Sequence, residues 1–312
     1  MKYRRLGGTD LDVSVICLGP MRAAATKPGA DEKSRAGERA LRRALEHGVN
    51  FVHSSYEYGT RWMMSRVLRD HPKRAELHHV IKVPVPDFTD GDRFDAAKFR
   101  LRIEEALRDL HAERIAVLQW MWRSDPNDDA RRLPLLGRIL DDVAAAFEKL
   151  RAEGKAGYLF TFPYTVPCAQ AALATGRFGG LLAYYNLAEM EMADLFADLE
   201  RRRLGFIAIR PLYEGVLTDE RAAPRAGDRV ADPQYAPALS KRRKIVEAFR
   251  DEIGESLTSF ALRCALAAPV VASLVVGLNR PEQVDGIVQA IEGPCPPPEM
   301  VRRAQALWRA GL

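Results

Sequence analysis

Residues 48–59 read GVNFVHSSYEYG, and this stretch shows how helix and strand alternate along the chain. Gly48 follows a helical run over Glu38–Glu46, and glycine is a residue that commonly ends helices. Asn50–Ser54 is then a short apolar run of the kind that forms a strand. A strand that follows a helix and leads into a polar turn is the repeating unit of a parallel α/β protein.

The same unit recurs on both sides of this stretch, because helical sequence such as Ala97–Leu110, Leu136–Arg151 and Ser256–Ala267 separates short strand-like runs. The strand-like runs are Val13–Leu18, Asn50–Ser54, His79–Val83, Ile115–Trp120, Ala156–Thr161, Leu181–Tyr185, Phe206–Arg210 and Val271–Val276. This number of units predicts a closed (β/α)8 TIM barrel.

A β-hairpin is expected before the barrel, because Tyr3–Leu6 is strand-like and the glycine-rich turn 7–9 follows it. The whole chain, residues 1–312, is predicted to be a single barrel domain. The alternative is a doubly wound open sheet, which normally carries G-x-G-x-x-G after a strand, and the sequence has no such motif. Two irregular stretches, Asp87–Arg93 and Thr218–Leu239, follow strands and are candidate lids or surface insertions.

Composition excludes several classes of partner. The net charge of +5 is spread over arginine-rich helix faces without a groove-reading motif, so no nucleic-acid partner is expected. No apolar run reaches the length of a membrane span, so no membrane partner is expected either. A small-molecule ligand remains the expected partner, and the sequence leaves the oligomeric state open.

The four cysteines are Cys17, Cys168, Cys264 and Cys295, and they lie far apart without C-x-x-C spacing. This spacing argues against a disulfide framework and against a metal site. Reduced, mostly buried thiols in a cytoplasmic protein are the expectation.

Segments along nearly the whole chain resemble the aldo-keto reductase family, in order and at the family's spacing. They are Tyr3–Gly7, Val13–Met21, Gly48–Val52 with Tyr58-Gly59, Gly154–Tyr158, Tyr185-Asn186, Arg210–Leu212 with Gly215 and Leu217, and Val276–Gln283. The resemblance implies a barrel that holds NADPH across its mouth and reduces carbonyl compounds, with a tyrosine as the acid and a lysine beside it.

The resemblance places Tyr58 at the acid position and Lys82 at the lysine position. His53 stands where the family has the aspartate that pairs with the lysine, and Met121 stands where it has a histidine. Methionine cannot donate a hydrogen bond to a carbonyl oxygen. The predicted catalytic residues are therefore Tyr58, Lys82 and His53, with Lys82 lacking its usual carboxylate and prone to lose its proton.

The cofactor positions also depart from the family pattern. Phe162 and Pro163 stand where a Ser-Asn pair contacts the nicotinamide, and Leu182 replaces a glutamine. Weak or absent NADPH binding is expected, because several polar contacts are lost together. The residues that could still hold a dinucleotide are Arg210, Leu212, Gly215, Gly277, Arg280 and Gln283, and Arg280 is the cation expected to offset Glu214.

Aromatic and apolar residues near the strand ends suggest a pocket for a flat, cationic or sugar-like ligand, although packing explains many of them equally well. The expected substrate pocket consists of Trp62, Trp120, Met121, Trp122, Phe162 and Tyr184.

Three functions fit this pattern. The first is a divergent enzyme that acts on a small carbonyl- or sugar-like molecule by acid–base chemistry (elimination, isomerisation or aldol type), with little or no use of NADPH. The alternative is an atypical NAD(P)H-dependent carbonyl oxidoreductase. The second alternative is a non-catalytic ligand-binding barrel. We expect the first, because the nicotinamide contacts are lost while Tyr58 and Lys82 are kept.

Overall fold

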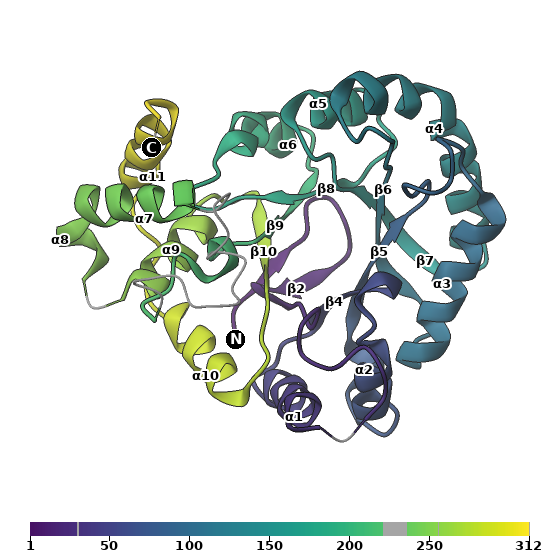
Figure 1. Cartoon of the computed structure of the whole chain (residues 1–312), viewed down its shortest axis with the longest axis horizontal. Helices are drawn as coiled ribbons and strands as arrows, with labels where there is room; N and C mark the ends of the chain where they lie inside the picture. Colours follow the sequence, from purple (N-terminus) through teal and green to yellow (C-terminus); the bar gives the residue numbers. More distant parts are fainter. Residues whose placement is uncertain (30, 221–235, 255, 312) are drawn as a thin grey trace.

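The computed structural model describes residues 1–29, 31–220, 236–254 and 256–311, and its eight parallel strands confirm the predicted closed barrel. The strands follow one another in the order β10-β3-β4-β5-β6-β7-β8-β9, and the helices surround them (Figure 1). Their bounds are β3 Ile16–Leu18, β4 Phe51–Ser55, β5 His78–Pro84, β6 Ile115–Met121, β7 Ala156–Thr161, β8 Gly180–Tyr184, β9 Gly205–Ile209 and β10 Val271–Val276.

The predicted N-terminal hairpin is also present, as β1 Tyr3–Arg5 paired antiparallel with β2 Asp12–Ser14. The run expected as one strand, Val13–Leu18, is divided, because its first part pairs with β1 and its second part with β4 and β10. The Ser14 hydroxyl donates to the Ile16 carbonyl at 2.7 Å where the chain passes from one sheet to the other.

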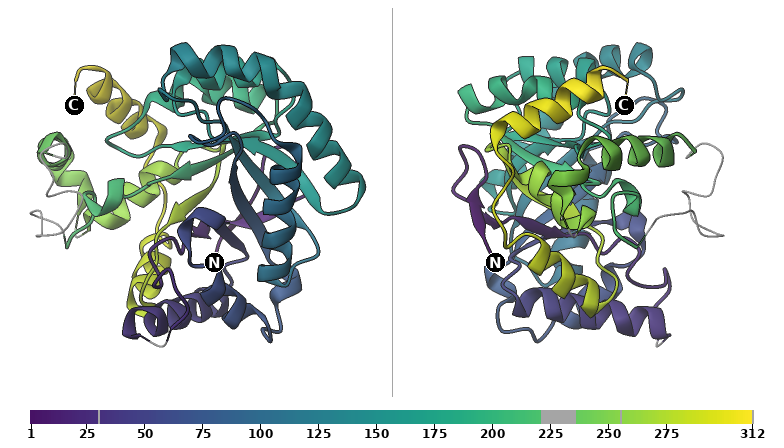
Figure 2. Two further views of the ribbon diagram at one scale, coloured as in Figure 1. Left: turned by 45° about the vertical axis from the view of Figure 1, so that its right-hand side comes forward. Right: turned by 90° about the vertical axis from the view of Figure 1, so that its left-hand side faces the viewer.

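The hairpin closes one end of the barrel (Figure 2). Its residues Leu6, Leu11 and Val13 are buried and pack in one cluster with Cys17 and Phe51 of the barrel strands. The loops that follow the barrel strands therefore form the opposite end, where barrel enzymes carry their sites.

The helices lie outside the barrel, and three of the long ones begin at an aspartate cap. The side chains of Asp31, Asp95 and Asp128 each accept a backbone hydrogen bond from the residue three positions later. The helices are α1 Glu32–Glu46, α2 Arg61–Leu68, α3 Ala96–Leu110, α4 Asp129–Ala152, α5 Val166–Ala174, α6 Phe196–Arg201, α7 Ala236–Ala248, α8 Arg250–Ile253, α9 Leu257–Leu266, α10 Pro281–Ala290 and α11 Pro298–Arg309. Among these described helices, none is both long and apolar enough to cross a bilayer.

Side chains alternate between two cores along each strand, and this alternation decides which residues reach the site. One cluster fills the barrel interior and includes Phe51, Val80, Val117, Phe160 and Leu182. The larger cluster lies between the strands and the surrounding helices. Strand residues an even number of positions from a member of the interior cluster point the same way as it does. Where such a residue is the last of its strand, its side chain faces the barrel mouth.

Two expectations concern other parts of the chain. Cys17, Cys168 and Cys264 are buried and Cys295 is exposed, and none of these four described cysteines forms a disulfide. Of the candidate lid Thr218–Leu239, residues 221–235 lie outside the described residues, and helix α7 begins at Ala236.

Candidate functional site

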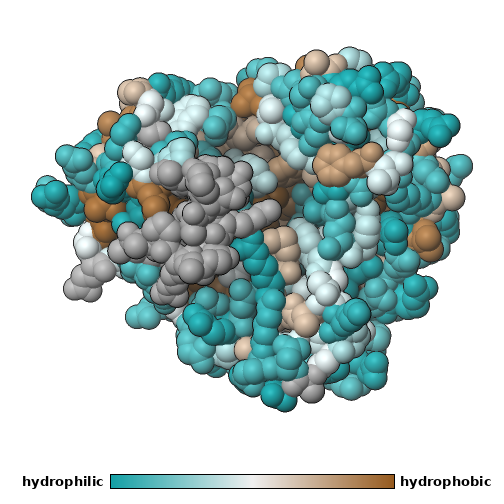
Figure 3. Space-filling model, viewed as in Figure 1, coloured by the Kyte–Doolittle hydropathy of each residue, from teal (hydrophilic) through white to brown (hydrophobic). Residues whose placement is uncertain are grey.

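The candidate site lies at the end of the barrel opposite the hairpin, where the loops after β4 to β10 converge. In the space-filling view of this face, apolar surface is visible in the recess near the middle of the molecule, and polar surface dominates the rim (Figure 3). A ligand in this recess would contact the last inward-facing side chains of the strands.

Tyr58 sits in a short 3-10 turn, η1 Tyr56–Tyr58, directly after β4. The Ser55 hydroxyl starts this turn by accepting from the Glu57 amide at 3.3 Å, and Gly59 ends it with a left-handed φ of 64°. The Lys82 ammonium on β5 lies over the Tyr58 ring, 4.8 Å from its centroid. The structure thus brings together the two residues that the sequence assigns as acid and lysine.

Lys82 has a carboxylate partner, and this corrects the prediction that it lacks one. Its Nζ lies 2.6 Å from Oε2 of Glu57, and the two side chains are 15% and 23% exposed. Burial lowers the pKa of Lys82, and the ion pair with Glu57 opposes that shift. The carboxylate that β4 lacks, because His53 replaces it, is supplied from the turn beside Tyr58.

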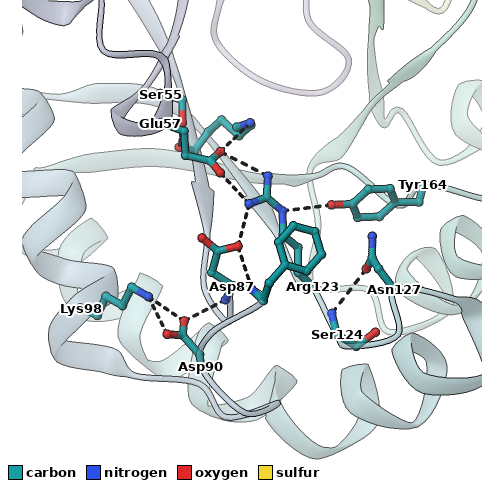
Figure 4. Close-up of polar contacts among 11 residues, drawn as sticks. Ser55, Glu57, Asp87, Asp90, Lys98, Arg123, Ser124, Asn127 and Tyr164 are labelled. Atoms are coloured by element: carbon teal, nitrogen blue, oxygen red, sulfur yellow. Dashed lines mark hydrogen bonds and ion pairs between the residues drawn. The ribbon is translucent and has the colours of Figure 1, made fainter. Parts of the chain in front are cut away.

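Glu57 is held from its other side by Arg123, which follows β6 (Figure 4). Nη1 of Arg123 lies 2.5 Å from Oε1 of Glu57 and 2.7 Å from Oδ1 of Asp87, and its Nε donates to the Tyr164 hydroxyl at 3.3 Å. Burial opposes ionisation of Glu57, but the hydrogen bonds from Arg123 and Lys82 outweigh it and keep the pKa of Glu57 below its usual value. The ends of β4, β5, β6 and β7 are joined by this network.

His53 is buried beside these groups and makes one short contact, between its Nε2 and Oε1 of Gln119 at 2.7 Å. Burial lowers the pKa of His53 to about 4, with the Lys82 charge acting in the same direction and Gln119 against it. His53 is therefore neutral near pH 7 and a weak base. Its Nε2 donates if Gln119 presents its oxygen, which leaves Nδ1 as the acceptor.

The buried histidines predict a pH-dependent stability. Burial lowers the pKa of both His53 and His79 to about 4 from an ordinary 6.5. Between these values the unfolded chain binds a proton at each position that the folded chain does not, so stability is present at neutral pH and is lost as the pH falls. From about pH 7.5 to about pH 5, each histidine should lower the unfolding free energy by about 2 kcal/mol.

Urea unfolding at the two pH values measures this loss, and His79→Leu should remove about half of it. Histidine NMR signals from positions 53 and 79 that titrate near the ordinary pKa would contradict the prediction.

Met121, Phe162 and Tyr184, which are predicted for the substrate pocket, stand at or directly after the ends of β6, β7 and β8, at positions that alternate inward. Phe162 is buried, and its ring contacts those of Tyr164 and Tyr184 edge-on, with centroids at 4.8 Å and 5.1 Å. Met121 is the last residue of β6, and its side chain points to the same side of the strand as that of Gln119, two positions earlier. These side chains give a ligand an apolar wall opposite the charged network.

Trp120 and Trp122, predicted for the same pocket, are placed elsewhere. Both are fully buried in the cluster between the barrel and the helices, where their rings stack at 5.0 Å. Their indole N–H groups donate to the carbonyls of Val85 and Arg132. Strand alternation explains the correction, because neighbours of the inward-facing Met121 must face outward.

Trp62 also lies away from the recess. Its indole N–H donates to the Ala25 carbonyl at 2.9 Å, and the guanidinium of Arg66 lies over its ring. It lines an outer pocket of about 410 Å³ beside α2, together with Pro28, Ser65 and Asp109. Trp62 thus fixes the loop after β3 against α2.

Five of the six predicted cofactor-binding residues lie in the segments that follow the neighbouring strands β9 and β10, and the sixth, Gln283, lies in the first turn of α10. The six are Arg210, Leu212, Gly215, Gly277, Arg280 and Gln283. Gln283 holds the second loop by accepting from the Asn279 amide at 3.0 Å, and Arg280 precedes the first turn of α10. Arg22 and Arg210 each lie 3.7 Å from the Glu214 carboxylate, whereas the expected Arg280 forms no ion pair with it among the described residues.

Sequence reasoning missed Glu57, Arg123 and Gln119 as members of the site. Their positions in the sequence could have indicated them. Glu57 adjoins Tyr58, Arg123 follows β6, and the side chain of Gln119 points inward like that of Met121.

The chain matches a family model described as the aldo/keto reductase family over residues 15–308. It is 30% identical to an uncharacterized oxidoreductase of Bacillus subtilis, YrpG, over 94% of this chain and 91% of that protein. It is 24% identical to the L-galactose dehydrogenase of Arabidopsis thaliana, over 93% of this chain and 88% of that protein.

Solved structures share the fold. An aldo-keto reductase of Bacillus halodurans superposes with a TM-score of 0.76 at 20% identity, covering 98% of this chain and 96% of that one. The glycerol dehydrogenase of Gluconobacter oxydans superposes with a TM-score of 0.77 at 22% identity, covering 99% and 96%.

Proposed function

The chain belongs to the aldo/keto reductase family, and from this membership we propose that it reduces the carbonyl group of a small molecule with NADPH or NADH. The observation that carries the proposal is the Glu57–Lys82–Tyr58 arrangement, with the ion pair at 2.6 Å and the ammonium 4.8 Å from the ring centroid. A tyrosine, a lysine and a carboxylate are present together, although the carboxylate comes from the turn rather than from β4.

The proton chemistry follows from the surroundings of Tyr58. Burial, and then the Glu57 charge, raise the pKa of Tyr58, so its hydroxyl keeps its proton at every physiological pH. As negative charge develops on a substrate carbonyl oxygen, the hydroxyl can donate this proton, and the Lys82 cation over the ring stabilises the phenolate that forms.

The other side chains of the site orient the substrate. Neutral His53 can accept a hydrogen bond from a substrate hydroxyl, while Met121 and Phe162 exclude water from the reacting carbonyl. Glu57 keeps Lys82 charged, and Arg123 keeps Glu57 in place. A small carbonyl- or sugar-like substrate fits this mixture of apolar and polar contacts.

A bound dinucleotide would supply the hydride. The loop after β10 offers partners for its adenosine half. Arg280 stands at the start of α10, where a phosphate can bind, and the buried Oδ1 of Asn279, which has no hydrogen-bond partner among the described residues, can accept from a hydroxyl or amino group of the nucleotide. The carboxamide half has fewer partners, since Phe162 is apolar and Pro163 has no amide hydrogen. We therefore expect binding weaker than a full set of polar contacts would give.

Titration with NADPH and NADH, followed by nucleotide fluorescence and calorimetry, tests the proposal. Binding at micromolar concentrations, together with NADPH oxidation in the presence of an aromatic aldehyde, is the expected outcome. An absence of binding at millimolar nucleotide would exclude the proposal.

A second candidate is acid–base chemistry on a carbonyl- or sugar-like molecule without a dinucleotide. One observation favours it, since burial lowers the pKa of Lys82 beside a site whose carboxamide partners are replaced by Phe162 and Pro163. A neutral lysine can form a Schiff base with a carbonyl compound. Borohydride trapping of a small ketone on Lys82, with no dinucleotide present, would support this candidate.

A further inference from the structure

We propose that Arg210 and Arg22 bind a carboxylate of the substrate, so that the enzyme acts on carbonyl compounds that also carry an acid group. This inference rests on the proposed reduction, and it names the substrate class. It comes from the way these two arginines surround the carboxylate of Glu214.

Arg210 is fixed in place by rings rather than by close ion pairs. Its guanidinium lies over the rings of Tyr184 and Tyr213, with centroids at 4.7 Å and 5.2 Å. The nearest carboxylate contacts are 3.4 Å to Glu189 and 3.7 Å to Glu214, whereas charge-assisted hydrogen bonds are about 2.7–2.9 Å long. Its buried Nε has no hydrogen-bond partner within the described part of the chain. The Nε–H group of Arg210 therefore has no acceptor among the described residues.

Arg123 provides a contrast on the other side of the recess. Its contacts with Glu57 and Asp87 are 2.5 Å and 2.7 Å long, and its Nε reaches Tyr164. The guanidinium of Arg123 is therefore already paired with the carboxylates of Glu57 and Asp87. Arg210 has the same chemistry and lies at the same mouth, but among the described residues it has no carboxylate partner as close as those of Arg123.

Glu214 occupies the position that a ligand carboxylate would take. Its side chain lies 3.7 Å from Nη2 of Arg22 and 3.7 Å from Nε of Arg210, between the loops after β3 and β9. Glu214 has a left-handed φ of 54° in the short turn η4 Tyr213–Gly215, a conformation that costs energy for a residue with a side chain. A substrate carboxylate that displaces it could bind the planar fork of Arg210 with two hydrogen bonds.

The position relative to Tyr58 suits a substrate with both groups. Tyr184 carries Arg210 on its face, contacts Phe162 edge-on, and is close enough to Tyr58 for its charge to affect the pKa of that residue. Tyr184 thus contacts the arginine and interacts electrostatically with the proton donor. A molecule that places its carbonyl at Tyr58 could place an acid group at Arg210 across this ring.

The experiment compares p-carboxybenzaldehyde with benzaldehyde, which share the reacting aldehyde. The wild-type protein should show the higher kcat/KM for the acid. Arg210→Gln should lower the ratio of kcat/KM for the acid to kcat/KM for benzaldehyde by roughly 10–100-fold, the size of a charged hydrogen bond. Glu214→Gln should raise kcat/KM for the acid relative to benzaldehyde, because it removes the carboxylate that competes for the two arginines. Arg66→Gln is the matched control, since it removes an exposed arginine of α2 from outside the recess.

Equal losses for both aldehydes in Arg210→Gln, no preference of the wild type for the acid, or a weaker NADPH affinity with the acid preference unchanged would each overturn the inference. The last result would assign the arginine to a dinucleotide phosphate. Calorimetry with benzoate and benzyl alcohol needs no turnover. Benzoate binding that Arg210→Gln abolishes would support the inference even if the protein reduced no aldehyde, so the two proposals can fail separately.

Discussion

Tyr58→Phe is expected to reduce kcat for aldehyde reduction by about 10²–10⁴-fold, the usual contribution of a positioned general acid. The ring, its contact with the Lys82 ammonium and the turn around it remain, and only the hydroxyl group is removed. Steady-state NADPH oxidation with benzaldehyde measures the loss. Nucleotide affinity and the thermal unfolding temperature should stay close to the wild-type values.

Tyr56→Phe is the matched control for this change. Tyr56 lies in the same turn, and burial raises its pKa to about 12, but its ring faces the guanidinium of Arg102 on α3 at 4.2 Å. It should retain nearly full activity. Comparable losses in the two variants would mean that the turn as a whole, rather than the Tyr58 hydroxyl, supports turnover.

Glu57→Gln should lower kcat by roughly 10–100-fold and shift the alkaline limb of the pH–rate profile to lower pH. Burial already lowers the pKa of Lys82, and Glu57 is the group that raises it most. Without that carboxylate, Lys82 loses its proton at a lower pH, and the phenolate of Tyr58 then forms without a cation beside it. The profile of kcat against pH measures both effects.

Asp87→Asn separates this role from general damage to the network. It removes the second carboxylate of Arg123, at 2.7 Å, but leaves the Glu57–Lys82 contact in place. Its alkaline limb should shift less than that of Glu57→Gln. An unmoved limb in Glu57→Gln would show that Glu57 serves folding alone.

The barrel could be predicted from the sequence because each β/α unit repeats a local pattern of strand, turn and amphipathic helix. The roles of Tyr58 and Lys82 were predicted from the resemblance to the family, and each residue lies at the end of a short predicted strand or in the turn after it. The parity error at β6 was avoidable, because Trp120 and Trp122 cannot share a face with Met121. The confirmed prediction, the closed barrel, depends on local pattern.

Contacts between turns were harder to predict. The Lys82–Glu57 pair depends on how η1 directs the Glu57 side chain toward β5, and no sequence spacing specifies that direction. The same applies to Arg210, whose neighbours come from β8 and from the segments after β8 and β9. A missing residue at one position therefore does not establish that its chemistry is missing, because a side chain from an adjacent turn can supply it.

The hairpin that closes the far end of the barrel limits how ligands enter and leave. Because Leu6, Leu11 and Val13 close that end, reactant and product must enter and leave through the same opening, at the barrel mouth. A molecule deeper in the recess cannot depart while another lies above it. We therefore expect exit to be sequential, with the departure of the inner occupant gated by the outer one.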